Sequence, residues 1–522
     1  MNNKFKRIIS ILIMAAILLS VTACNGGGNG NGDDGTRQRQ TNDEADAAVQ
    51  AQAQILKTHE SLPDIEVTEK IKLMSWYDLD ETSPTAEIFK AKYGIPGEGI
   101  PEPGEKDVGN IFDIIRVPYD ERYPQLNSRI AAGDSPDMFQ FEERNFPWGV
   151  RANNYEAIDD LFDFSGSEWD ATRDVMDLFK WQGKTYCAVT EISNSSALLY
   201  YKKTTAQEAG LDDPYDLWLQ NRWNWDTFFE MCTEFSDPAN NKYAIVGFYI
   251  DEAAILSTGT PIVGIENGQL KHNMDNIKIE RAMDLLRRLA TNNLRYPYHE
   301  ISGFQIMPGP WRNGEVLFWG DGPWRNQEEI KVMRNADKWP EDEVNIVPFP
   351  KDPDADKYYH RGKQDALMLV AGAQNKDGFV AWTQCSVLAA QDKEMDWANR
   401  NKIMNQHGWT DLQLDTLQKI RDELTLVWDF KNGIGEDVSG ATFNSPVENL
   451  SKRVVVFGDS YPQMRGENRG VIEPRIIAIN TGGDVETYEI PECECDPNAV
   501  EEEFCEVCGS TEQLERTTIE DE

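Results

Sequence analysis

The stretch RIAAGDSPDMFQFEE, residues 129–143, constrains the fold more than any other part of the chain. Tyr123, Leu126 and Ile130 recur at helical spacing, and Gly133 stands where a helix ends in a left-handed residue. The DSPD sequence is typical of a turn, and MFQF is the short, largely apolar run of a buried strand. A helix, a sharp turn and a buried strand make half of a βαβ-type unit.

An aromatic residue and two acids follow this strand, namely Phe141, Glu142 and Glu143. In open α/β sheets, ligands gather beyond the carboxyl ends of the strands. We therefore predict that these three residues edge a ligand cleft.

Strand and helix patterns alternate along the rest of the chain and predict a mainly parallel α/β sheet. Residues 71–76 alternate as a first strand, and Ser83-Pro84 opens a helix as N-cap and first helical residue. Asp226 is the expected cap of the next clear amphipathic helix. Residues 411–427 are predicted to be helical. The apolar VVVF at 454–457 is predicted to be a core strand.

Composition limits the function. The chain has 522 residues, 40% of them hydrophobic, which is enough for a real core and for several structural units. The net charge is −39. Phosphate binding needs a basic surface, so we predict no nucleic-acid partner.

The N-terminus carries a targeting signal. Lys4, Lys6 and Arg7 precede an apolar run that is shorter than the ~20 residues of a bilayer-spanning helix. The run ends in Val-Thr-Ala-Cys, which resembles the lipobox of bacterial lipoproteins. By that resemblance residues 1–23 are a lipoprotein signal peptide and Cys24 carries the lipid. The alternative is an ordinary secretory signal with a chance cysteine. Residues 24–64 are expected to form a flexible polar tether.

The C-terminal residues 481–522 form an acidic extension with four cysteines, Cys493, Cys495, Cys505 and Cys508. Outside the cell two disulfides or free thiols are favoured, and a single zinc site is the alternative. We predict no metal site and no cofactor. The remaining cysteines, Cys187, Cys232 and Cys385, lie in apolar surroundings and are expected to be buried thiols.

Five motifs in order resemble the extracellular solute-binding proteins of ABC importers, family 1, the carbohydrate-binding type. They are KLMSWYD, RIAAGDSPDMF, WQGKTYCAV with ALLYYKKTTAQEAGL, RWNWDTFFE and NGEVLFWGDGPW. The resemblance covers roughly residues 71–480. Two departures are Tyr201-Lys202, where the family usually has Tyr-Asn, and the missing proline after Val189.

The resemblance implies an α/β, two-lobed periplasmic-binding-protein fold of class II type with a hinge. Lobe one would comprise residues 65–193 and 351–400. Lobe two would comprise residues 194–350 and 401–480. The protein would be a lipid-anchored monomer on the extracellular face of a bacterial membrane. It would deliver a carbohydrate, expected to be an oligosaccharide, to the transmembrane subunits of an ABC permease.

A sugar site combines aromatic rings, which pack on apolar C–H faces, with acids that bind hydroxyls. The resemblance aligns Trp324 and Phe141 with positions that stack on sugar, and Trp76 and Asp78 follow the first strand. Glu142, Glu143 and Asp321 complete the predicted ligand-binding set. Replacing Phe141 or Trp324 by Ala is predicted to weaken binding and leave the fold intact.

Two other functions stay open. A secreted carbohydrate-active hydrolase would share the aromatic cleft, and the same binding fold could serve a non-sugar solute. The sequence VVVFGDSY around Ser460 resembles an esterase nucleophile block, but no histidine follows it to activate the serine. We therefore predict a binding protein and not an enzyme.

Overall fold

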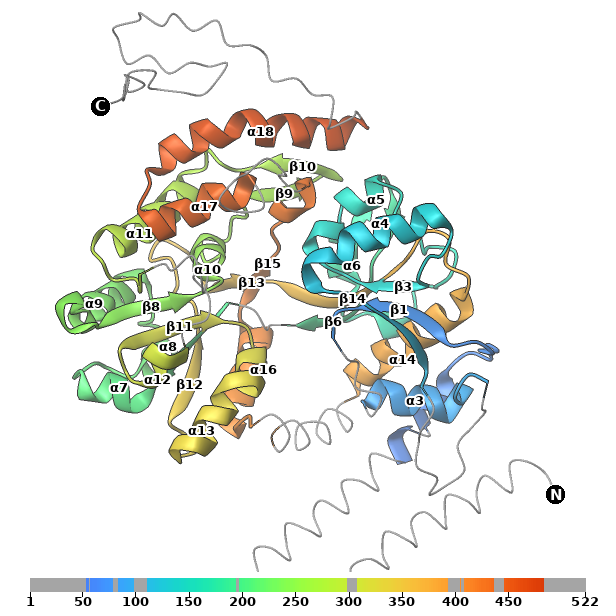
Figure 1. Ribbon diagram of the computed structural model, residues 1–522, viewed down its shortest axis with the longest axis horizontal. Coiled ribbons are helices and arrows are strands. Elements are labelled where there is room, and N and C mark those ends of the chain that lie inside the picture. Colours follow the sequence, from blue (N-terminus) through green and yellow to red (C-terminus); the bar gives the residue numbers. More distant parts are fainter. Residues whose placement is uncertain are drawn as a thin grey trace, which may run out of the picture.

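The computed structural model describes residues 53–55, 57–77, 83–97, 110–193, 197–297, 308–392, 404, 408–435 and 446–482. Cys24, Asp78 and the four C-terminal cysteines lie outside the described residues. The described elements form two α/β lobes, each built around its own sheet (Figure 1). Within the segment predicted as a tether, Ile55 and Leu62 are buried in the core.

The sheet of lobe one has the strand order β2-β1-β3-β14-β6. Its strands are β1 (Ile71–Ser75), β2 (Phe112–Arg116), β3 (Met138–Gln140), β14 (Lys363–Leu369) and β6 (Ala188–Ser193). Strand β1 runs parallel to β2 and β3, whereas β14 runs antiparallel to β3 and β6. The carboxyl ends of β1, β2 and β3 therefore meet at one edge of this sheet.

The sheet of lobe two has the strand order β12-β7-β11-β8. Its strands are β12 (Val344–Pro348), β7 (Leu198–Lys202), β11 (Val316–Asp321) and β8 (Tyr243–Gly247). Strands β8 and β11 are parallel, so their carboxyl ends also lie together. Gly247 has a φ of 134°, and a Cβ there would overlap the carbonyl oxygen of Gly320. Glycine is therefore required where these two strands approach.

Helices cover both sheets (Figure 1). Around lobe one lie α3 (Pro84–Tyr93), α4 (Arg122–Ala132), α5 (Trp148–Arg151), α6 (Arg173–Leu178) and α14 (Lys376–Gln391). Around lobe two lie α7 (Lys203–Glu208), α8 (Pro214–Leu219), α9 (Trp225–Phe235), α10 (Ile250–Leu256), α11 (Ile277–Thr291), α12 (Pro308–Arg312), α13 (Lys331–Asp337), α16 (Asp411–Glu423), α17 (Pro446–Phe457) and α18 (Tyr461–Thr481). Within the described ranges, no helix has the length and apolarity that crossing a membrane requires.

The local signals of the opening motif are confirmed. Helix α4 ends at Gly133 in the left-handed conformation, and β3 follows after the turn. The side chain of Ser83 accepts a hydrogen bond from the amide of Ala86 and caps α3. Helix α9 is capped by Asn224 and not, as predicted, by Asp226.

Two predicted elements near the C-terminus are wrong. The VVVF run lies in α17, because Val447, Leu450 and Val454 are fully buried at helical spacing and their packing decides the conformation. Helix α16 ends at Glu423, and the predicted helical residues beyond it form strand β15 (Thr425–Val427), which pairs with β13 (Tyr359–Arg361).

The chain passes between the lobes three times. It leaves lobe one after β6, returns between β12 and β14, and leaves again between α14 and α16. The small β13–β15 sheet and the short helix η7 (Lys431–Ile434) lie in the region of these crossings. Figure 1 shows β13, β14 and β6 between the two lobes.

Candidate functional site

Lobe one carries an aromatic cluster beyond β1 and β2. Trp76 makes edge contacts with Tyr77 and Tyr119, at centroid distances of 5.4 and 5.6 Å. The Tyr77 and Tyr119 side chains are 39% and 52% exposed. The Arg122 guanidinium lies 3.6 Å from the Tyr119 ring centroid and 5.3 Å from that of Trp76. Clustered, partly exposed aromatic rings are characteristic of a binding surface.

Glu142 holds this cluster in place. Arg122 donates two hydrogen bonds to its carboxylate, from Nε at 2.6 Å and from Nη2 at 3.1 Å, and the Tyr123 hydroxyl donates a third. Burial disfavours the charge on Arg122, but the hydrogen bond to Glu142 and the electrostatic attraction of Tyr123 and Glu142 together outweigh it and raise the arginine pKa. The paired arginine in turn fixes the ring of Tyr119.

Phe141 and Glu143 face the interior of the junction. Phe141 is 8% exposed and packs edge-on against Phe179 at 5.0 Å. Its amide donates to the carbonyl of Ala366 at 2.9 Å, which joins β3 to β14. The carboxylate of Glu143 accepts hydrogen bonds from Arg361 and from Asn432 Nδ2. Phe141 therefore has no face open to solvent comparable to that of Tyr77, whereas the Glu143 side chain is 30% exposed.

Lobe two contributes Trp324, which follows β11. The ring is half-buried and lies edge-on to Tyr249 at 6.0 Å. A Cβ on Gly322 would overlap the indole of Trp324, so glycine at this position leaves room for the ring. Trp324 thereby presents an aromatic surface at the carboxyl end of the parallel β8–β11 pair.

The buried Asp321 stabilises the turn that carries Trp324. It accepts hydrogen bonds from Arg325 Nε at 2.7 Å and from the amide of Gly322 at 2.8 Å. Burial raises the pKa of Asp321 to about 6, although the nearby Arg325 acts in the opposite direction. Arg325 also pairs with Glu329 at 2.6 Å. These contacts fix the turn that carries Trp324.

Strand β14 connects the two aromatic groups. Lys363 Nζ lies 5.4 Å from the ring centroid of Trp324. Two residues on, Asp365 is close enough to Tyr77 to raise its pKa, although burial of that hydroxyl is the larger cause. The Tyr77 hydroxyl donates to Gln140 on β3. Side chains on one face of β14 therefore lie between the aromatic groups of the two lobes.

Arg361 forms the main charged link across the junction. Its guanidinium pairs with Glu143, which follows β3 of lobe one, and its Nε lies 2.6 Å from Glu252 Oε2 on α10 of lobe two. Lys431 Nζ lies 2.8 Å from the other oxygen of Glu252. Burial disfavours the charge on Glu252, but Arg361 and then Lys431 outweigh it and lower its pKa to about 2.

A small cavity lies beside this network. It has a volume of about 10 Å³ and is lined by Phe141, Glu143, Phe179, Gln364, Trp428, Asp429 and Phe430. That volume is near the lower limit for a single water molecule, so the cavity is too small for a solute. Burial raises the pKa of Asp429 to about 6, partly offset by Lys431.

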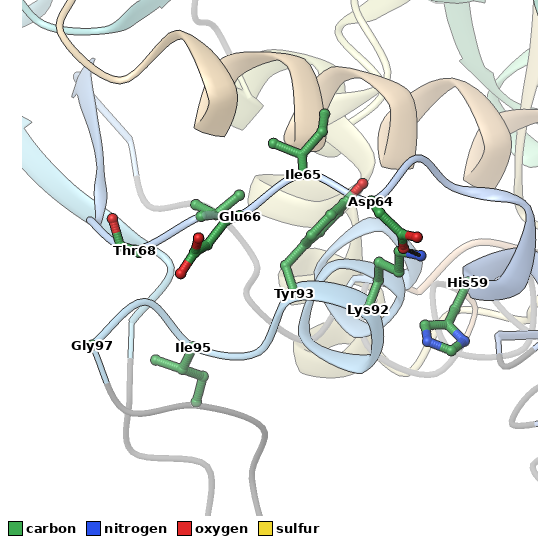
Figure 2. A pocket seen from close by; sticks show the side chains of 10 residues that line it. His59, Asp64, Ile65, Glu66, Thr68, Lys92, Tyr93, Ile95 and Gly97 are labelled. Atoms are coloured by element: carbon green, nitrogen blue, oxygen red, sulfur yellow. Dashed lines mark hydrogen bonds and ion pairs between the residues drawn. The ribbon is translucent and has the colours of Figure 1, made fainter. Parts of the chain in front are cut away.

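A second hollow of about 660 Å³ lies on lobe one (Figure 2). Its lining comes from the segment that precedes β1 and from the end of α3, and an Asp64–Lys92 ion pair of 2.8 Å spans it. It therefore lies at the amino end of β1, opposite the edge that carries Trp76. Sheets of this kind bind ligands at the carboxyl edge, so this hollow is not the candidate site.

The described part of the chain contains possible metal ligands and three cysteines. There, no group of three His, Cys, Asp or Glu side chains is placed to hold a metal ion. Cys187, Cys232 and Cys385 are buried and free, as predicted, and burial raises the pKa of each thiol. Ser460 occupies the N-cap position of α18.

Comparison with known proteins places the chain in a family. Residues 94–384, more than half of the chain, match the model of the bacterial extracellular solute-binding proteins, and the chain belongs to this family. A search of curated protein sequences found no match.

Three solved structures have the same fold. A cyclo/maltodextrin-binding protein complexed with maltotetraose is 14% identical, covers 81% of this chain and 100% of its own, and has a TM-score of 0.53. A Thermotoga lettingae ABC transporter solute-binding protein bound with α-D-tagatose is 15% identical, with 79% and 99% coverage and a TM-score of 0.53. UgpB of Mycobacterium tuberculosis in complex with glycerophosphocholine is 13% identical, with 78% and 99% coverage and a TM-score of 0.52.

The expected two-lobed fold is thereby confirmed, but both sheets are mixed and not mainly parallel as predicted, because β14 and β7 each run antiparallel to the two strands beside them. It is the two-lobed, class II type of periplasmic-binding-protein fold, with a hinge between the lobes. The chain is an extracellular solute-binding protein of the ABC transporter type. At these low identities, the solved structures bear on the fold alone.

The structure brings some predicted site residues to one junction and adds others. Trp76 and Trp324 lie at strand ends of different lobes, and Asp78 lies outside the described residues. The sequence analysis did not predict Tyr77 and Tyr119 as site residues. The run of polar and aromatic residues after β1 could have indicated Tyr77. No local signal distinguishes Asp365 from the other acids of the chain.

Proposed function

We propose that the protein captures a carbohydrate between its two lobes and delivers it to an ABC import permease. The observation that carries the proposal is the pair of aromatic groups across β14. Trp76 and Tyr77 belong to lobe one, and Trp324 belongs to lobe two. Sugar rings offer apolar faces to such rings and hydroxyls to the polar groups between them.

Capture then works through lobe closure without a covalent step. A ligand that contacts both aromatic groups binds the closed arrangement more tightly than the open one, and its differential affinity shifts the population toward closure. The buried Arg361 link between Glu143 and Glu252 lies at the junction that must accommodate this motion. The closed form is the one that docks on the permease.

The proposed lobes are residues 65–193 with 351–400, and residues 194–350 with 401–480. Phe141, Glu142, Glu143 and Asp321 remain proposed site residues, together with Asp78. In the structure the four described ones contact other protein groups, so we assign them to shaping the site around Trp76 and Trp324. With this division, each lobe carries one of the two aromatic groups.

Anchoring is part of the proposal. A signal peptide over residues 1–23 would direct export, and lipidation of Cys24 would hold the protein at the outer face of the cell membrane as a monomer. Stable anchoring takes more than one acyl chain, which fits a lipid-modified N-terminal cysteine. Mass spectrometry of the membrane fraction tests this: an acylated Cys24 peptide supports the anchor, and an unmodified soluble protein contradicts it.

Binding is tested by thermal shift against a glycan panel, because a bound ligand raises apparent stability by mass action. We expect a concentration-dependent rise with at least one neutral oligosaccharide. Products released from the same glycan would instead identify a hydrolase. A panel arm with glycerophosphocholine, the solute in one of the similar structures, tests the non-sugar alternative.

A further inference from the structure

Asp365 occupies an unusual position on β14. The strand alternates, so Gln364 and Ala366 are buried on one face whereas Asp365 is exposed on the other. Lys363, on the same face, lies beside Trp324 of lobe two. On the lobe-one side, the Tyr77 hydroxyl donates to Gln140, which pairs with Leu367, two residues after Asp365 on β14. The carboxylate therefore lies between the two aromatic groups.

The backbone at Asp365 directs its side chain. The register between β14 and β6 shifts between Asp365 and Ala366, which marks a β-bulge. The hydroxyl of Thr190 on β6 donates to the Asp365 carbonyl at 3.0 Å and stabilises this irregularity. Bulges re-aim side chains and are frequent beside functional sites. The bulge leaves the carboxylate on the open face of the strand.

The neighbouring acids all have partners. Glu142 is bound by Arg122, Glu143 by Arg361, and Asp321 by Arg325. Glu191 on β6, directly opposite Asp365, lies 3.6 Å from Arg421.

Asp365 differs from them. Within the described residues its carboxylate accepts no hydrogen bond and forms no ion pair of 4 Å or less. The Asp365 side chain is exposed, so water donates to its carboxylate when no ligand is bound, and a ligand hydroxyl can replace that water.

The geometry points to Asp365 as a ligand-binding carboxylate that accepts hydrogen bonds from two ring hydroxyls, or from an amine, of a sugar held between Tyr77 and Trp324. This inference rests on the proposed function and narrows its ligand class. An anionic sugar would bring a like charge next to Asp365, and Lys363 on the same face would offset part of that repulsion. We therefore expect neutral and amino sugars to bind more tightly than sugar acids and sugar phosphates.

The test uses the full chain and two variants, Asp365→Asn and the control Glu191→Gln. Glu191 is the matched control because it is the acid directly across the strand pair and already faces an arginine. Calorimetric titration measures the affinity of each protein for maltotetraose, fully deacetylated chitotetraose, neutral β-linked tetrasaccharides and tetragalacturonate. Melting temperatures within a few degrees of the wild type establish that the variants are folded.

We expect the wild type to bind a neutral or amino tetrasaccharide more tightly than tetragalacturonate. Hydrogen bonds to a charged group make Asp365→Asn weaker by about ten- to a hundredfold, and Glu191→Gln stays within about twofold. Equal affinities of wild type and Asp365→Asn overturn the assignment of Asp365 alone. Binding of tetragalacturonate by the wild type that is as tight as that of the neutral and amino sugars overturns the ligand class. No binding of any neutral or amino sugar by the wild type overturns the proposed function and this inference with it.

Discussion

Replacing Arg361 with methionine tests the link between the lobes. The substitution removes the cation that lies between Glu143 and Glu252 while retaining much of the side-chain volume. The arginine is 8% exposed, so both carboxylates lose a buried partner. Removing one partner of a buried ion pair typically costs ~3–5 kcal/mol because the remaining charge stays desolvated.

The lowered pKa of Glu252 gives a second estimate of the free energy of unfolding that Arg361→Met should lose. Its lowering from 4.5 to about 2 corresponds to about 3 kcal/mol of stabilisation shared by Arg361 and Lys431. Because Lys431 remains in the variant, we expect a loss near the lower limit, about 3 kcal/mol. A carboxylate whose pKa is lowered by folding stabilises the folded state at pH values above its unfolded pKa. Its contribution therefore disappears as the pH falls from about 4.5 to about 2.

The assay is urea-induced unfolding of wild type and Arg361→Met at pH 7 and pH 3. The matched control is Lys271→Met, which removes a cation from an exposed pair with Glu266 and should cost less than about 1 kcal/mol. The difference between wild type and Arg361→Met should shrink at pH 3. A cost at pH 7 equal to that of the control would refute the account of a buried link.

Other changes separate binding from folding. Trp324→Ala should weaken sugar binding in calorimetry with little change in unfolding. Phe141→Ala, contrary to the expectation from the sequence, should cost ~3–5 kcal/mol in urea unfolding because its ring is buried and packed in the junction. Asp321 has a pKa raised by burial, so its contribution to stability is present below about 4 and lost as the pH rises to about 6; Asp321→Asn should flatten the stability profile over that interval. The buried thiols should resist iodoacetamide in the folded protein and react after denaturation, as peptide mass spectrometry can establish for Cys187, Cys232 and Cys385.

The fold was predictable where local chemistry decides it. The glycine at 133 ends α4, and Ser83 begins α3, because capping depends on residues within one turn. The VVVF run shows the limit of this reasoning. Three β-branched residues in a row favour a strand locally, but burial of Val447, Leu450 and Val454 along one helix face favours α17.

The proposed site was predictable only in part, because contacts between residues far apart in the chain cannot be inferred from local sequence. Trp76 was predicted because it follows the first strand, and Trp324 because of the family resemblance; both stay proposed site residues. Arg361 was missed because its partner Glu143 is 218 residues away in the chain. Asp365 was missed because its role depends on which acids lack a partner, and the pairing of 90 acidic residues cannot be inferred from the sequence.

The most direct test of the central claim is calorimetric titration of the full chain with the glycan panel, followed by product analysis of the same samples. The account predicts saturable binding of a neutral or amino oligosaccharide that is recovered unchanged, and weaker binding by Trp324→Ala. Cleavage of the glycan, or the absence of binding to every sugar in the panel, would contradict it.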